Sequence, residues 1–153
     1  MKSLLIGVLF SLPVFGQTHY MDSHVLRLKP GQDVYQEIAK FTKAQNIQAA
    51  SIISVVGSLS ESQIRFANKK EATKIKGPLE VLSLSGTTSV DGTHLHIAVA
   101  DGDGKTLGGH LVEGNKVYTT LELVIAEYYG ISFKRKLDPA TGFNELNVEK
   151  LKK

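Results

Sequence analysis

The sequence predicts a single α+β domain, a mainly antiparallel β-sheet with one principal helix packed on it. A chain of 153 residues is long enough for one domain with a substantial core, since about 150 residues bury roughly 68–70% of their unfolded surface. One stretch, residues 33–46, has helical periodicity, and most of the chain after it consists of short β-branched runs separated by turns. Neither internal repeats nor heptads interrupt this pattern.

The one clear helix follows the turn pair Pro30-Gly31. Asp33 can cap its N-terminus, and Asn46 is a suitable stop. Apolar side chains recur at i, i+4 and i+7 on one face, at Val34, Ile38 and Phe41. The helix is therefore expected to pack this face on a sheet.

The predicted strands are recognised from alternation or from β-branched apolar runs. In chain order they cover residues 25–29, 50–56, 63–67, 79–86, 93–100, 106–112, 117–126, 133–137 and 143–148. Residues 58–62 are expected to form a turn and residues 68–77 a polar loop. The run 50–56 is almost entirely apolar, as in a strand covered on both faces. A single helix covers little, so self-association is expected to cover the rest.

The first sixteen residues resemble a secretory signal peptide. A positive Lys2 precedes an apolar run over residues 4–12, which is too short to span a bilayer, and cleavage is expected before Gln17. The predicted organisation is a signal peptide at 1–16, a linker at 17–24, the folded domain at 25–148 and a lysine-rich tail at 149–153. The mature protein would then be secreted, with no membrane attachment. A start at Met21 would give a cytoplasmic protein instead.

Composition excludes several kinds of chemistry. The chain contains no cysteine, so disulfides, thiolate metal sites and cysteine nucleophiles are excluded. A formal net charge of +3 is too small to require a polyanionic partner. Any zinc ion would have to be held by histidine and carboxylate side chains.

Three histidines flank one predicted hairpin turn. His94 and His96 are two residues apart, so on a strand both rings project from the same face. After the turn at residues 101–104, the chain returns and brings His110 beside them. Three imidazoles are the ligand set of an open zinc site, whose fourth position is left for water or substrate. The alternative is that the histidines are ordinary polar residues on a solvated sheet face.

The length of the hairpin loop decides between these two interpretations. A three-residue loop, Gly102 to Gly104, places His96 directly opposite His110, on the same face. A two-residue loop turns His110 to the other face, because a slip of one residue flips every side chain. A bulge at Gly108-Gly109 would also restore the required face.

A metal ion at this site would lower the pKa of a bound water or polarise a carbonyl oxygen. Glu80 and Glu122, each within an apolar strand, are the carboxylates predicted to orient a ligand or to move a proton. Their alternative role is that of ordinary glutamates at the rim of the sheet. The substrate is not indicated by any motif.

Several segments in fixed order resemble the plants-and-prokaryotes-conserved (PPC) domain, from about Val25 to Val148. They are Leu26-Arg27-Leu28-Lys29-Pro30-Gly31, Ala49-Ala50-Ser51, Val56-Gly57-Ser58-Leu59, Gly77-Pro78-Leu79-Glu80-Val81-Leu82-Ser83-Leu84-Ser85-Gly86, His94-Leu95-His96, Gly108-Gly109-His110-Leu111 and Thr141-Gly142-Phe143.

This resemblance implies an α+β fold and a homotrimer. Plant members join the domain to AT-hook motifs that bind DNA, but this chain has no such motif, so DNA is not an expected partner. The fold also looks similar to that of acetolactate decarboxylase, whose zinc is held by a His-x-His pair and a later histidine. By that analogy His94, His96 and His110 would hold one zinc ion per chain, in a lyase or hydrolase acting on a small carbonyl or carboxylate compound. The alternative is a non-enzymatic assembly or DNA-associated module.

Overall fold

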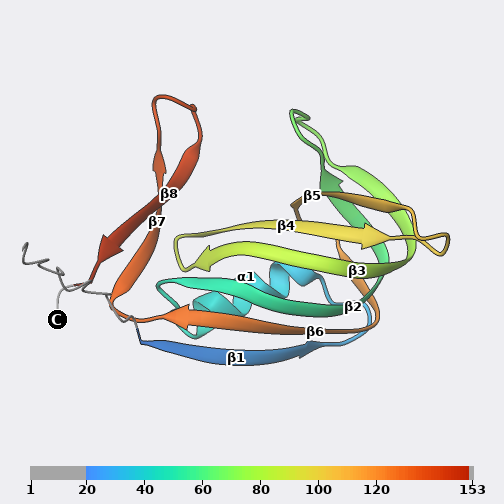
Figure 1. The fold of residues 1–153 in the computed structure, drawn as a ribbon, viewed down its shortest axis with the longest axis horizontal. Helices are drawn as coiled ribbons and strands as arrows, with labels where there is room; N and C mark the ends of the chain where they lie inside the picture. The colour runs from blue at the N-terminus through green and yellow to red at the C-terminus, as the bar shows by residue number, and fades with distance from the viewer. Residues whose placement is uncertain (1–19, 152–153) are drawn as a thin grey trace, which may run out of the picture.

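The computed structural model describes residues 20–151, which fold into one helix and eight strands (Figure 1). In chain order these are β1 (Met21–Leu28), α1 (Val34–Ala44), β2 (Ala50–Arg65), β3 (Thr73–Ser89), β4 (Gly92–Ala100), β5 (Thr106–Leu111), β6 (Lys116–Tyr128), β7 (Ile131–Leu137) and β8 (Asn144–Lys150). The α+β prediction is confirmed. The predicted signal peptide lies outside the described residues.

Six strands form one antiparallel sheet in the order β1-β6-β2-β3-β4-β5. The far end of β2 also pairs with β5, through Ile64 with Leu111 and Arg65 with His110. The sheet therefore curls until its last strand meets a strand from its middle. β7 and β8 form a separate two-stranded hairpin, here called the arm, which projects from the main sheet (Figure 1).

The helix begins and ends as its sequence predicts. The Asp33 carboxylate accepts a hydrogen bond from the Gln36 backbone N–H at 3.1 Å, which satisfies one of the free N–H groups of the first turn. Asn46, two residues past the last helical residue, has a φ of 54° and ends the helix in the left-handed region. Val34 and Ile38 are fully buried against the sheet.

The core lies between α1 and one face of the main sheet. Every second side chain of β4 enters it, at Leu95, Ile97 and Val99. Leu121, Leu123 and Ile125 of β6 do the same. The helix covers this inner face and lies behind the sheet in Figure 1, so the opposite, outer face is the one that the sheet presents to the viewer.

Two predictions about β2 and β3 are wrong. Residues 58–62 are not a turn, because β2 continues through them as a bulged strand. Their serines pair across strands instead, as Ser58 Oγ does with Thr119 Oγ1 at 2.7 Å. The expected loop over residues 68–77 is shorter, because β3 begins at Thr73.

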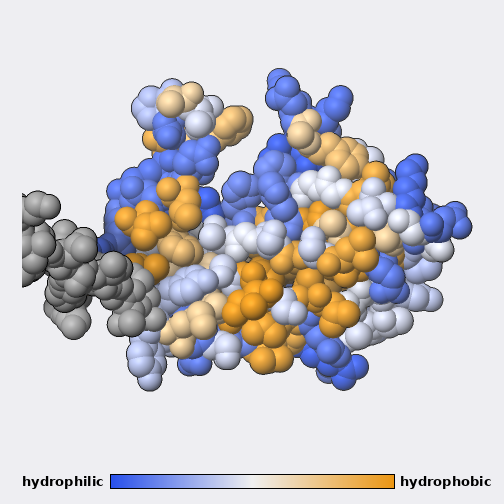
Figure 2. Space-filling model, viewed as in Figure 1, coloured by the Kyte–Doolittle hydropathy of each residue, from blue (hydrophilic) through white to orange (hydrophobic). Residues whose placement is uncertain are grey.

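Residues 50–56 are covered on one face only within this chain. Ile53 is 56% exposed and Val56 is 60% exposed, whereas Ala50 and Ile52 are buried. Val25 of β1 and Leu82 of β3 are similarly exposed, at 78% and 55%. We call these four residues of the outer face (Val25, Ile53, Val56 and Leu82) the outer patch, and apolar atoms are prominent on this face in Figure 2.

None of the helices among residues 20–151 has the length and apolar character needed to cross a bilayer.

Candidate metal centre

Strand β4 presents two histidines on the outer face. Because side chains alternate along a strand, burial of Leu95 and Ile97 in the core forces His94 and His96 to the opposite side. The ring of His96 lies opposite His110 of β5, since these two residues are direct partners in the β4–β5 pair. All three histidines therefore share one face of the sheet.

The turn between β4 and β5 has the odd length that this register requires. Asp101 and Lys105 close it with a backbone hydrogen bond of 3.1 Å, which leaves the three-residue loop Gly102 to Gly104. The Asp101 carboxylate also accepts a hydrogen bond from the Lys105 N–H at 2.9 Å, and Gly104 supplies a φ of +78°. The predicted loop is confirmed, and no bulge is needed.

Gly108 and Gly109 allow strands to approach closely, rather than forming a bulge. Gly109 pairs regularly with Ile97. A Cβ on Gly109 would come within 2.8 Å of the Arg65 carbonyl oxygen and 2.9 Å of the Ile64 side chain. Glycine is thus required at position 109, where the end of β2 pairs with β5, one residue before His110.

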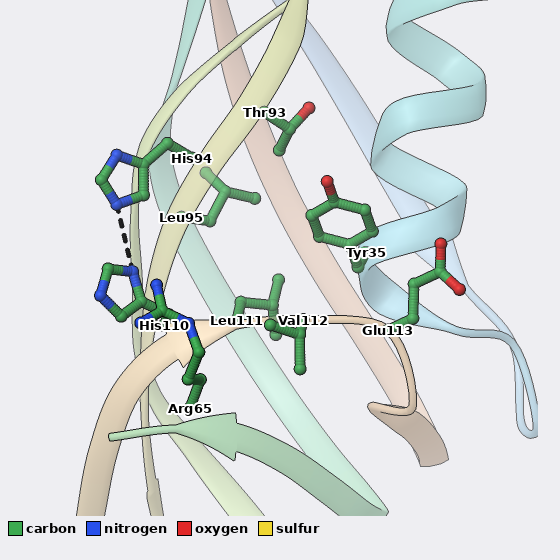
Figure 3. A pocket seen from close by; sticks show the side chains of 9 residues that line it. All are labelled: Tyr35, Arg65, Thr93, His94, Leu95, His110, Leu111, Val112 and Glu113. Atoms are coloured by element: carbon green, nitrogen blue, oxygen red, sulfur yellow. Dashed lines mark hydrogen bonds between the residues drawn. The ribbon is translucent and has the colours of Figure 1, made fainter. Parts of the chain in front are cut away.

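The ring nitrogens of the three histidines converge. His110 Nδ1 lies 3.2 Å from His94 Nε2 and 3.1 Å from His96 Nε2 (Figure 3 draws the first of these contacts). One nitrogen from each ring lies within 4.8 Å of the other two. Tetrahedral zinc holds its nitrogen ligands roughly 3.3–3.4 Å apart, for bonds of about 2.0–2.1 Å. The donor set fits one such ion, and the two distances to His110 Nδ1 are close to this spacing.

Hydrogen bonding alone does not account for this arrangement. Nδ1 of a neutral imidazole either donates one proton or accepts at one lone pair, so it can make one good hydrogen bond, yet two ring nitrogens approach the same atom. In the described part of the chain the three rings make hydrogen bonds only with one another. A shared cation would satisfy all three nitrogens together.

The surroundings keep two of these rings neutral. Partial burial is the main factor that lowers the pKa of His94, and the charges of His96, Arg135 and Arg65 lower it further, while Glu145 opposes them. Burial also lowers the pKa of His110, with Arg65 the next contributor. Neutral imidazole is the form that binds a metal ion, so these two ligands are ready at neutral pH.

The structure does not bring the two predicted carboxylates to the histidines. Glu80 is exposed on the outer face but pairs with Ala100, four residues beyond His96 on β4, which is about 13 Å along the strand. Glu122 lies on β6, and β2 and β3 separate that strand from β4, a span of about 14 Å. Both residues occupy the same face as the triad without being its neighbours.

Arg65 and Glu145 line the cleft together with His94 and His110, and sequence reasoning missed both. Arg65 pairs directly with His110, and Figure 3 shows its guanidinium group beside the His110 ring. Glu145 of the arm lines the same cleft as His94, and its charge raises the pKa of that histidine. The position of Arg65 depends on the return of β2 to β5, and that of Glu145 depends on the placement of the arm. Neither position has a local sequence signal.

An open cleft of about 820 Å³ lies over the triad. His94 and His110 line it, together with Arg65, the β2–β3 turn at residues 68–70 and the arm at residues 143–145. Figure 2 shows the hollow between the arm and the rest of the molecule. Its volume falls within the range typical of small-molecule sites.

The sheet is antiparallel and curled, one helix covers it, and a histidine triad lies in an open cleft. Together, these features define a class of small α+β proteins with a candidate metal centre. The model of the Plants and Prokaryotes Conserved (PCC) domain matches residues 16–129, and the chain belongs to this family. The predicted family resemblance is confirmed. The similarity to acetolactate decarboxylase stays a prediction.

Among curated relatives, the chain is 48% identical over 126 residues to the bifunctional protein GlmU of a Synechococcus species. The match covers 82% of this chain but 20% of that protein, so the chain spans about a fifth of the length of this relative. The activities of the longer protein are therefore not carried over.

Two solved structures share the fold over most of their length. A hypothetical protein of Salmonella enterica is 38% identical, with a TM-score of 0.85 over 88% of this chain and 97% of that one. A protein of Archaeoglobus fulgidus described as metal-containing is 29% identical, with a TM-score of 0.71 over 89% of this chain and 99% of that one.

Proposed function

We propose that His94, His96 and His110 hold one zinc ion per chain and leave a coordination position open to the cleft. The observation that carries this proposal is the approach of two Nε2 atoms to His110 Nδ1, at 3.1 and 3.2 Å. The metal-containing protein of Archaeoglobus fulgidus supports it, because it has the same fold. The proposed activity is that of a lyase or hydrolase acting on a small carbonyl or carboxylate compound.

Zinc bound here would supply a Lewis acid that acidifies water or polarises a carbonyl oxygen. The chain's own residues would do the rest. Glu145, which lines the same cleft as His94, is the carboxylate proposed to accept or return a proton, the role that the sequence predicts for Glu80 and Glu122. The arm and the β2–β3 turn would limit the size of the compound that reaches the triad.

Metal analysis of protein purified without a histidine tag tests the centre. We expect about one equivalent of zinc per chain, and less than a tenth of an equivalent in His96→Ala and in His110→Ala. His24→Ala is the matched control, because His24 contacts Glu127 at 2.8 Å and lies outside the triad. Wild-type protein with less than a tenth of an equivalent would contradict the proposal.

We also propose that the protein assembles as a homotrimer through the outer face. The outer patch supports this, because four large apolar side chains on one sheet face, each more than half exposed, favour contact with another protein surface. Three copies can bring their outer patches together around a threefold axis, and the number three is what the family resemblance implies. Light scattering should give the mass of a trimer at micromolar concentration. Val56→Asp should give monomers, whereas Leu137→Asp, which alters an exposed leucine of the arm, should not.

We also propose that the protein is secreted. This proposal is supported by the order of positive, apolar and small residues in the first sixteen positions. Sequencing the N-terminus of the natural protein should find Gln17. A natural N-terminus at Met1 or Met21 would contradict it.

A further inference from the structure

We propose that a small organic acid binds with its carboxylate between Arg65 and the open coordination position of the metal. This inference rests on the proposed zinc centre and names the class of compound that the centre takes. Its basis is the position of Arg65, the charge of the cleft and the shape of the guanidinium group.

Arg65 is fixed beside the triad by the register of the sheet. It is the direct cross-strand partner of His110, so the two Cβ atoms are about 4.5–5.5 Å apart. Its one hydrogen bond among the described residues is a long contact of 3.4 Å from Nη1 to the Lys69 carbonyl oxygen. Most of the five N–H donors of the guanidinium group are therefore available to a ligand in the cleft.

The charge around the triad favours an anion. Three cationic side chains line the cleft (Arg65, Lys69 and Lys70), against a single carboxylate, Glu145. Three neutral imidazoles would leave the full double charge on a bound zinc ion, and the adjacent guanidinium group adds repulsion. A bound anion would offset the charge of the zinc ion and its repulsion with the guanidinium group. A mainly cationic cleft also concentrates anionic ligands.

A carboxylate suits this cleft better than a phosphate. The planar guanidinium group forms paired hydrogen bonds with the two oxygens of a carboxylate. The residues that line the cleft come from strands, a hairpin turn and the arm, so no helix N-terminus contributes the N–H groups typical of a phosphate site. Glu145 also opposes a second negative charge on the ligand.

The test uses Co²⁺ in place of zinc, with its visible spectrum as the readout and acetate as the probe. In wild-type protein, acetate should change the Co²⁺ spectrum in a saturable way. In Arg65→Gln the dissociation constant for acetate should rise at least tenfold, while Co²⁺ binds as tightly or more tightly. Lys105→Gln is the matched control, because it removes one positive charge on the exposed β4–β5 turn, and its acetate affinity should stay within twofold.

Arg65→Lys provides a second variant that keeps the charge. A single ammonium group cannot reproduce the paired hydrogen bonds, so acetate should bind at least threefold more weakly than to the wild type. Wild-type acetate affinity in both Arg65 variants, with Co²⁺ bound, would overturn this inference and leave the metal centre intact. Phosphate bound more tightly than acetate in an Arg65-dependent way would overturn the carboxylate assignment. Failure of the wild type to bind Co²⁺ would instead overturn the proposed function.

Discussion

His96 and His110 are direct cross-strand partners, and their ring nitrogens Nε2 and Nδ1 lie 3.1 Å apart. The turn that joins β4 to β5 sets the register of this pairing. Because facing residues of an antiparallel pair share a side of the sheet, the length of the turn determines whether a third histidine reaches the other two.

Lengthening this turn should therefore have an alternating effect. Insertion of one glycine after Gly102 moves His110 to the opposite face or forces a bulge, and zinc content should fall at least tenfold. Insertion of two glycines at the same place restores the parity and should preserve most of the zinc. Metal analysis of the two purified variants checks this. Equal zinc content in both would show that the turn does not control the centre.

The stability of the metal-free protein should fall in mildly acidic solution. The pKa values of His94 and His110 are lowered below 6.5 in the folded state, so the unfolded chain takes up protons first as the pH drops. Their contribution to stability is complete above pH 6.5 and is lost as the pH falls through the lowered values. Urea unfolding in chelator at several pH values measures this. The double variant His94→Gln/His110→Gln should show a weaker pH dependence, and an unchanged dependence would contradict the assignment.

Gly86→Ala should disturb both the fold and the centre. Gly86 has a φ of +131°, and a methyl group there would clash with the backbone carbonyl oxygen of His94 on the adjacent strand. We expect a loss of roughly 3 kcal/mol in the free energy of unfolding, together with weaker zinc binding. Gly102→Ala is the control, since nothing lies within 4 Å of a Cβ at that position. Chemical denaturation compares the two, and similar losses would contradict the steric argument.

Asp33→Ala should destabilise the protein more than the loss of an ordinary helix cap. The buried carboxylate caps α1 through Gln36 and also accepts a 2.6 Å hydrogen bond from the Gly114 N–H. Loss of the cap costs about 1 kcal/mol, and the unpaired Gly114 N–H adds about 1–3 kcal/mol. Denaturant unfolding should show the sum. Glu37→Ala, a change in the same helical turn, should stay within about 0.5 kcal/mol of the wild type.

Local sequence signals were sufficient for the helix, the hairpin and the triad. The cap at Asp33, the alternation around His94 and the odd loop before His110 each depend on neighbours in the chain. Periodicity and turn chemistry describe such neighbours well.

What could not be predicted depends on long-range geometry. The serines at 58–62 look like a turn, but bulges keep them within β2, and the same long strand carries Arg65 back to β5. The sequence favours Glu80 and Glu122 because they interrupt apolar strands. The order of the strands in the sheet places these two residues away from the triad, and a strand pattern does not specify that order. The carboxylate that lines the cleft comes from the arm instead.

The β4–β5 hairpin gathers all three histidines within seventeen consecutive residues, 94–110. Closing such a short loop costs little entropy, so the ligands can meet before the rest of the chain has folded. Arg65 arrives only with the distant pairing of β2. An unfolded chain would thus retain some affinity for the ion, and the ion would then protect the native state by less than its binding constant suggests.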